Sequence, residues 1–218
     1  MTDTPRLVNG AYEYNGQRLP RVTTVLGILS KPGLEKWKHR VGLVEAERVS
    51  REAAGLGTEI HAACEYIARC HMAGDLPLMG PPPHLRSFVE AYHGWLAENV
   101  EAVESVEQFV YHPRDLYAGT ADLTVRLRDG RRMLVDIKSS NSIDGSYRLQ
   151  TSAYADALDA LGEPVDGRMI VNLPSRRPGV LNVIEYDDDA RDLKAWKAAL
   201  RLWRWNQRHA DDWKRLGR

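Results

Sequence analysis

Two aspartates and a lysine stand close together in a predicted pair of strands near the middle of the chain. The segment GTADLTVRLRDGRRMLVDIKSS, residues 119–140, predicts a β-hairpin with Asp122 on its first strand and Asp136 and Lys138 on its second. Side chains two positions apart on a strand point to the same face, so Asp136 and Lys138 share one side of the sheet. Carboxylates bind hard divalent cations, and an ammonium stabilises negative charge that develops on a phosphate. The three residues therefore suit hydrolysis of a phosphodiester.

The apolar residues of the two strands predict how the strands pair. Apolar and polar residues alternate on both strands, and residues 128–130 lie between them. A three-residue loop, with Gly130 in the left-handed conformation, places Asp122 opposite Asp136 and collects the apolar side chains on one face. A two-residue turn would place Asp122 opposite Ile137 and mix the faces, because a slip of one residue inverts every side chain. We therefore expect the longer loop.

Further polar residues at helical spacing extend this candidate site. Gly57 and His61 are four positions apart and share a helix face, where His61 offers an imidazole to the same metal. Gln150 and Tyr154 are also four apart, on the helix after the lysine strand, where they would bind a nucleic-acid backbone or orient the lysine. Each feature has a structural alternative: a surface or core-edge histidine, a structural Gln–Tyr pair, and an edge strand whose charges are solvated.

Length and composition are those of an ordinary globular protein. The 218 residues suit a single domain, and contents of 43% hydrophobic and 28% charged residues are typical of such domains. No apolar run reaches the roughly 18 residues of a transmembrane helix, and the N-terminus lacks the features of a signal peptide. Cys64 and Cys70 are too few for a disulfide framework or a four-thiolate cluster. We expect reduced thiols in a cytoplasmic protein without membrane contact.

Charge is balanced overall but not along the chain. The 30 basic and 30 acidic residues cancel, so net charge gives no indication of nucleic-acid binding. Residues 191–218, however, contain nine basic and three acidic residues, a net charge of +6. Contact with phosphate needs only a local basic surface, and the alternative is a solvated helix face. Tryptophans on another face of this helix, at positions 196 and 203, either stack on bases or pack on the sheet.

The order of predicted elements indicates an α/β fold. We expect a hairpin at 12–19, helices at 22–29, 34–41, 44–70 (with a break at Gly55 and Gly57 left open) and 84–99, a loop at 74–83, strands at 105–111, 120–127 and 132–137, a helix at 145–161, strands at 168–173 and 180–186, and a final helix from 191 capped by the aspartates at 187–189. This order predicts a central mixed β-sheet flanked by helices. Residues 1–100 form a mainly helical N-terminal region, 101–190 the sheet core with its crossover helix, and 191–218 a basic C-terminal helix.

Four short motifs together resemble those of the RecB-type branch of the PD-(D/E)XK nuclease superfamily. In the family's order, the chain contains G-x-x-x-H at Gly57 and His61, G-x-x-D at Gly119 and Asp122, D-x-K at Asp136 and Lys138, and Q-x-x-x-Y at Gln150 and Tyr154. The segment VTTVLGILSKPGLEKW is also similar to the opening of phage members and of mitochondrial genome maintenance exonucleases. The resemblance covers residues 21–154, and the basic tail matches no segment of the family.

The resemblance implies a restriction-endonuclease-like core and a role for each motif residue. It assigns the binding of Mg²⁺ or Mn²⁺ to His61, Asp122, Asp136 and the carbonyl of Ile137. Glu107 stands where the family often has an acid and joins these ligands. Lys138 would be catalytic, and Gln150 and Tyr154 would assist at the DNA or at the active site. Ala121 replaces a frequent proline, as is common in this branch, and the cysteines that hold an iron–sulfur cluster in some relatives are missing, so no cluster is expected.

The expected function is that of a metal-dependent deoxyribonuclease. By the resemblance, the protein is an exonuclease that acts on single-stranded DNA or duplex ends, in phage-type recombination or DNA processing. Its expected partners are DNA and a recombination or annealing protein, in the cytoplasm of a bacterial or phage-infected cell. Two alternatives stay open: a non-catalytic nucleic-acid-binding module on a nuclease fold, and a structure-specific endonuclease. The presence of both acids and the lysine argues against the first.

Overall fold

A five-stranded mixed β-sheet forms the centre of the computed structural model, which describes residues 6–8, 11–77, 80–186 and 190–210. The first half of the chain forms β1 (Arg6–Val8), β2 (Ala11–Tyr14), β3 (Gln17–Leu19), α1 (Val22–Leu26), α2 (Pro32–Val41), α3 (Leu43–Ala73), the 3₁₀ turn η1 (Pro83–Leu85) and α4 (Arg86–Asn99). The second half forms β4 (Val100–His112), β5 (Tyr117–Leu127), β6 (Arg132–Lys138), α5 (Ser146–Ala160), β7 (Gly167–Asn172), β8 (Asn182–Tyr186) and α6 (Ala190–Arg208).

The order of strands in this sheet is β4-β5-β6-β7-β8. Neighbouring strands pair antiparallel except β6 and β7, which are parallel and connected by the crossover helix α5. The predicted α/β fold with a central mixed sheet is confirmed. Because β6 lies between β5 and β7, Asp136 and Lys138 belong to an inner strand, and the alternative of a solvated edge strand is wrong.

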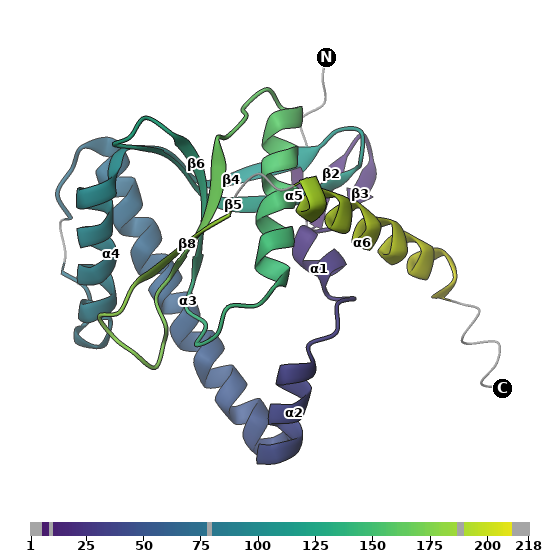
Figure 1. Cartoon of the computed structure of the whole chain (residues 1–218), viewed down its shortest axis with the longest axis horizontal. Helices are drawn as coiled ribbons and strands as arrows, with labels where there is room; N and C mark the ends of the chain where they lie inside the picture. The colour runs from purple at the N-terminus through teal and green to yellow at the C-terminus, as the bar shows by residue number, and fades with distance from the viewer. Residues whose placement is uncertain (1–5, 9–10, 78–79, 187–189, 211–218) are drawn as a thin grey trace.

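Helices cover both faces of the sheet (Figure 1). On one face, apolar residues of α3 and α4 pack against Leu123, Val125 and Val135. On the other, α1, α5 and α6 pack against Tyr117 and Leu134. Strands buried on both sides carry apolar residues at consecutive positions, and β6 is accordingly buried from its second to its sixth residue.

The hairpin of β5 and β6 has the predicted register. The N–H of Leu127 donates to the carbonyl of Arg131 at 2.8 Å, which closes the three-residue loop, and Gly130 has φ 90°. The ladder runs from this loop to the pair of Leu123 and Val135 and ends there. Asp122 directly precedes Leu123, so this register continued by one residue would place it opposite Asp136, but the pair is not part of the ladder.

The N-terminal elements differ from the prediction in detail. The predicted hairpin forms through an Asn15–Gly16 turn, in which both residues have positive φ, and β1 adds a strand that was not predicted. Helix α3 runs unbroken through Gly55 and Gly57 for 31 residues. The predicted cap at 187–189 and part of the predicted loop at 74–83 lie outside the described residues.

The C-terminal helix α6 is part of the core. Trp196 is fully buried, and its ring meets that of Tyr117 edge-on at 5.0 Å. Of the two predicted roles for this residue, it therefore packs on the sheet and is not free to stack on a base. Lys197 forms ion pairs with Asp115 and Asp156. The predicted basic face is thus partly occupied by partners within the protein. Among the described helices, none has the length and apolar character needed to cross a lipid bilayer.

Candidate active site

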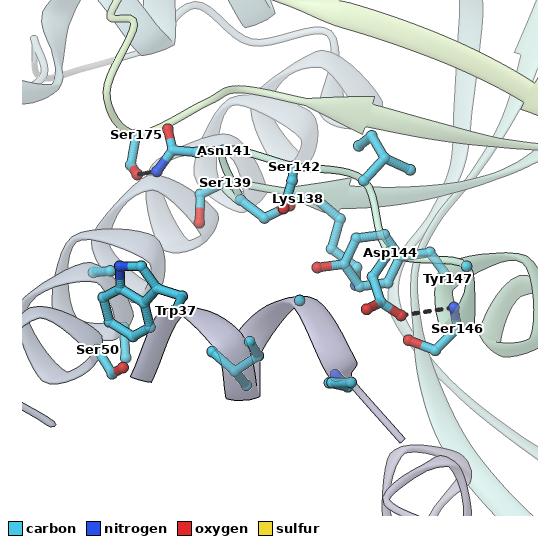
Figure 2. Close-up of a pocket in the computed structure, with 18 of the residues that line it drawn as sticks. Trp37, Ser50, Lys138, Ser139, Asn141, Ser142, Asp144, Ser146, Tyr147 and Ser175 are labelled. Atoms are coloured by element: carbon cyan, nitrogen blue, oxygen red, sulfur yellow. Dashed lines mark hydrogen bonds between the residues drawn. The ribbon is translucent and has the colours of Figure 1, made fainter. Parts of the chain in front are cut away.

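A cleft of about 560 Å³ opens between helix α3 and the strands β4, β5 and β6. The helix contributes Gly57 and His61, and the strands contribute Glu107, Asp122 and Lys138. A larger cavity of about 930 Å³ (Figure 2) adjoins it, and Lys138 belongs to the walls of both. Residues distant in the sequence, and singled out there for their chemistry, therefore line one surface.

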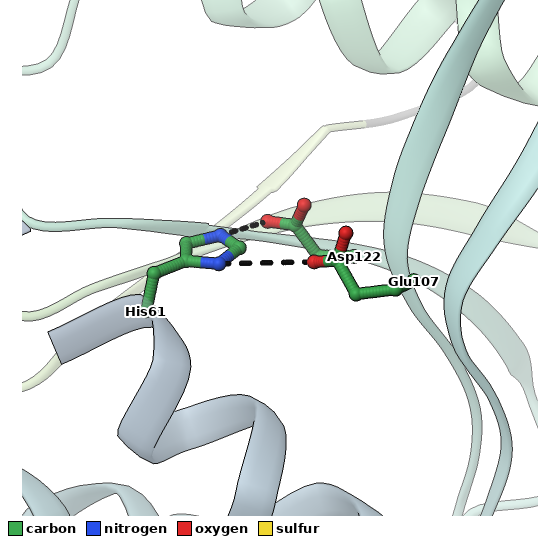
Figure 3. Close-up of side chains that lie close together, drawn as sticks. All are labelled: His61, Glu107 and Asp122. Carbon is green, nitrogen blue, oxygen red and sulfur yellow. Dashed lines mark hydrogen bonds and ion pairs between the residues drawn. The ribbon is translucent and has the colours of Figure 1, made fainter. Parts of the chain in front are cut away.

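The two ring nitrogens of His61 each face a carboxylate (Figure 3). Its Nε2 is 2.9 Å from Oδ2 of Asp122, and its Nδ1 is 3.7 Å from Oε1 of Glu107. One ligand atom from each of these three residues lies within 4.8 Å of the other two. The group thus offers one imidazole nitrogen and two carboxylate oxygens, from α3, β4 and β5, at a single point.

An unusual backbone conformation accompanies the position of Glu107. Its φ is 52°, in the left-handed region that residues other than glycine rarely adopt. Irregularities in the pairing of β4 with β5 lie just before it, at Val100/Ala102 and Val103/Ser105. Strained residues of this kind are often found at functional sites, where the surrounding structure holds them. The strain lies at a residue whose carboxylate reaches His61.

Asp136 and Lys138 form a second, buried group next to the first. The Lys138 Nζ lies 2.5 Å from Oδ2 of Asp136, whose other oxygen accepts a hydrogen bond of 2.8 Å from Nε2 of Gln150. Nε2 of Gln150 also lies 3.3 Å from the hydroxyl of Tyr154. Asp136 is only 1% exposed. Gln150 and Tyr154 are buried as well and do not line the cleft; Gln150 contacts Asp136 directly, and Tyr154 contacts Gln150.

The charges in the two groups influence one another. Hydrogen bonding to Asp122 raises the pKa of His61, although burial of the ring opposes this. Burial, assisted by the neighbouring Asp122, raises the pKa of Glu107. Burial likewise raises the pKa of Asp136 to about 6, against the effect of the Lys138 ammonium. For Lys138, burial favours the neutral amine, but the carboxylates of Asp136 and Asp122 outweigh it and raise its pKa. Lys138 therefore remains a cation.

Two motif glycines allow close approach between elements. A Cβ on Gly57 would lie 2.7 Å from Oγ of Ser139, which follows Lys138 in the chain. A Cβ on Gly119 would lie 2.4 Å from Cε1 of Tyr154. Both distances are shorter than real carbon contacts, so α3 and α5 approach the sheet this closely only because these positions lack a side chain. The glycines of the first two motifs thus have a packing role.

The structure brings together most of the predicted site residues, in two groups. His61, Glu107 and Asp122 converge, whereas Asp136 is turned toward Lys138 and Gln150 and lies outside their group. Ile137 lines the cleft, and its backbone N–H donates to Asp122.

Sequence reasoning missed Tyr147, whose ring centroid lies 4.9 Å from Nζ of Lys138. Two signals could have identified it: its aromatic ring and its position as the second residue of α5, the helix that follows the lysine strand.

A second cluster of acids and a histidine has a different character. His112, Asp115 and Asp156 also offer three ligand atoms within 4.8 Å. The ammonium of Lys197 lies against both carboxylates, and Asp156 accepts a hydrogen bond of 2.6 Å from the hydroxyl of Tyr117. A cation of the protein itself thus occupies the position between the acids. This cluster is an ion-pair network that connects α6 to α5 and to the β4–β5 turn.

The donor atoms at His61, Glu107 and Asp122 fit a divalent cation. Carboxylate oxygens suit Mg²⁺ and Mn²⁺, and imidazole nitrogen suits transition metals. The open side of the cleft leaves space for further ligands from solvent or substrate. Two carboxylates that lie this close to one another gain from a shared cation, and His61 adds a nitrogen ligand to them.

Comparison with known proteins adds little to this geometry. No family model matches the chain, and no curated protein matches its sequence. Among solved structures, the chain is similar to SSO0001, with 15% identity over 84% of this chain and 72% of that one, at a TM-score of 0.42. A likeness at that level carries no functional inference.

Proposed function

We propose that the protein is a metal-dependent deoxyribonuclease that hydrolyses DNA phosphodiester bonds as an exonuclease. One observation carries this proposal: Lys138, held by the buried Asp136, lines the same open cleft as the converging His61, Glu107 and Asp122. A site that binds a cation beside a fixed ammonium matches the needs of a phosphodiester, whose negative charge increases during hydrolysis.

Each residue has a part in this chemistry. His61, Glu107 and Asp122 would hold Mg²⁺ or Mn²⁺. A divalent ion, when bound, would supply Lewis acidity for a water nucleophile and offset the negative charge of the phosphate. Lys138 would stabilise the charge that develops on the phosphate or orient the attacking water. Asp136 and Gln150 hold this lysine in place, since Gln150 bonds one carboxylate oxygen and Lys138 the other.

The test is digestion of DNA labelled at either end, single-stranded or duplex, with Mg²⁺, Mn²⁺ or EDTA. We expect cleavage that needs the metal and starts at ends, and its loss in Asp122→Asn and Lys138→Gln. Asp129→Asn is the matched control, because Asp129 lies in the exposed loop of the same hairpin, bonds to Arg131 and does not line the cleft. This variant should cleave like the wild type.

The remaining outcomes separate the alternatives. Binding of DNA without cleavage under every metal condition would contradict the proposal and favour a non-catalytic binding module. Cleavage of circular single-stranded DNA would replace the exonuclease by an endonuclease. Full activity in either active-site variant would remove these residues from the mechanism.

A further inference from the structure

The cavity of about 930 Å³ beside the candidate active site has walls from two parts of the chain. Helices α2 and α3 form one side, and the loop after β6 with the start of α5 forms the other. Trp37 on α2 and Tyr147 on α5 lie on opposite sides of the cavity (Figure 2). Lys138 and Ser139 line both the cavity and the cleft. A ligand in the cavity would therefore extend directly to the lysine.

The two aromatic side chains are placed to contact flat groups. Helix α2 has no fully buried residue, and Trp37 remains partly accessible on it. Tyr147 is also partly accessible and lies against the Lys138 ammonium. Aromatic side chains that remain accessible in a groove are the platforms on which proteins stack unpaired bases.

The polar lining is suited to a phosphate backbone. Seven serines and Asn141 supply hydroxyl and amide groups, and Lys31 and Arg176 supply positive charge. Asp144 is the one acid in the lining, and it accepts the N–H of Ser146 at 2.8 Å. The cavity is thus cationic in a chain without net charge.

The loop wall is also fixed in position. Nδ2 of Asn141 donates to Oγ of Ser175 at 2.9 Å, and its Oδ1 accepts the N–H of Arg176 at 2.9 Å. The N–H of Ser175 donates to the carbonyl of Ser139 at 3.0 Å. These bonds connect the loop after β6 to the loop after β7, so the groups of the lining are organised before a ligand arrives.

Size decides between a paired and an unpaired strand. Sites of roughly 300–1,000 Å³ accommodate a small molecule, so this cavity accommodates one or two nucleotides and not a double helix. We propose that it binds the unpaired end of a DNA strand, with bases against Trp37 and Tyr147 and phosphates along the serine-rich loop. The inference rests on the proposed function for the bond that is cut, and it names single-stranded ends as the substrate.

Binding in EDTA tests the inference separately from cleavage. The probes are three fluorescein-labelled DNAs with equal numbers of phosphates: an oligothymidylate, an abasic strand without bases, and a closed hairpin without a free end. We expect the oligothymidylate to bind most tightly. Trp37→Ala should weaken its binding about tenfold, or about 1.4 kcal/mol, in the lower part of the range for base stacking. The same variant should leave binding of the abasic strand unchanged.

Two further variants complete the test. Trp205→Ala is the matched control, because Trp205 is 47% exposed on α6 and does not line the cavity. Tyr147→Leu keeps an apolar side chain at the second aromatic position and should also lower affinity for the oligothymidylate alone. Circular dichroism checks the fold of each variant. Equal binding of the three probes, or equal loss in Trp37→Ala and Trp205→Ala, would overturn the inference, even if metal-dependent cleavage were found. Base-dependent binding without cleavage would support the inferred binding site for single strands and contradict the proposed nuclease function.

Discussion

The side chain of Asp122 takes the place of a ladder partner for the backbone of Ile137. Its Oδ2 accepts the N–H of Ile137 at 2.7 Å, just beyond the last paired residues of the hairpin, and the same oxygen lies 2.9 Å from Nε2 of His61. One carboxylate therefore completes the hydrogen bonding of β6 and contacts the imidazole of the candidate metal site. Because the carboxylate has both roles, different substitutions of Asp122 should affect cleavage and stability to different degrees.

Asp122→Asn and Asp122→Ala should both lose cleavage but differ in stability. The amide of asparagine still accepts from Ile137, whereas alanine leaves a partly buried N–H without its acceptor, which costs about 1–3 kcal/mol. Urea unfolding of the three proteins measures the difference. Equal stability of the two variants would show that this hydrogen bond contributes nothing to the folded state.

Gly57→Ala should be sensitive to the residue at position 139. Alanine in place of glycine inside a helix stabilises it by up to about 1 kcal/mol. The new Cβ would lie 2.7 Å from Oγ of Ser139 but 3.9 Å from its Cβ. We expect no gain with Ser139 present and most of the gain in the Ser139→Ala background. Gly55→Ala, where a Cβ meets nothing within 4 Å, should gain equally in both backgrounds; thermal unfolding of the double-mutant cycle gives the coupling.

Glu107→Gly should be more stable than Glu107→Ala. Both variants lose the carboxylate, but only glycine adopts φ 52° without strain, which for other residues costs roughly 1–2 kcal/mol. At Gln108, which pairs regularly with Ala121 on the same strand and has no positive φ, the order should reverse, because glycine weakens an ordinary strand. Denaturant midpoints of the four variants test this, and the same order at both positions would contradict the assigned strain.

Acid should weaken the protein through His112. The ring is buried, and burial lowers its pKa, with Asp156 and Asp115 opposing and Lys197 and Arg114 assisting this effect. The ring therefore binds a proton more readily in the unfolded chain than in the folded protein. The contribution of His112 to the free energy of unfolding is thus complete above pH 6.5 and is lost as the pH falls through the folded pKa.

The control is His112→Asn, whose side-chain oxygen replaces Nδ1 as acceptor for the N–H of Asp115. The stability of the wild type relative to this variant should decrease between pH 7 and pH 5 in urea titrations. All other titrating groups are common to both proteins and cancel in the comparison. A difference that is independent of pH would mean that the ring titrates alike in both states.

Local patterns in the sequence determined the hairpin more fully than they determined the site. Alternation and Gly130 were sufficient for the register of β5 and β6, since a strand buried on a face tolerates no slip. The same alternation could not predict that Asp136 is buried. Its burial depends on α5, a helix that follows later in the chain and covers that face of the sheet.

No periodicity in the sequence requires the distant residues of the site to meet. His61 and Asp122 are 61 positions apart, and neither helical nor strand periodicity relates them. The left-handed backbone of Glu107 gave no sign in the sequence, because glutamate rarely adopts it. The internal partners of Lys197 were equally hidden: periodicity assigned this lysine to an outer face, whereas Asp115 and Asp156 approach it from other elements.

Helix α3 borders both the larger cavity and the cleft. Its 31 residues form an unbroken rod of about 46 Å, with Ser50 beside the larger cavity and His61 beside the cleft. Between them, Gly57 lies close to the loop after β6, where a Cβ would be only 2.7 Å from Oγ of Ser139. Because one unbroken helix contributes to both, a tilt of α3 would change the width of the larger cavity and the position of the His61 imidazole relative to Asp122 and Glu107 together. Binding of a DNA strand in the larger cavity and binding of a cation in the cleft would then be coupled through this one helix.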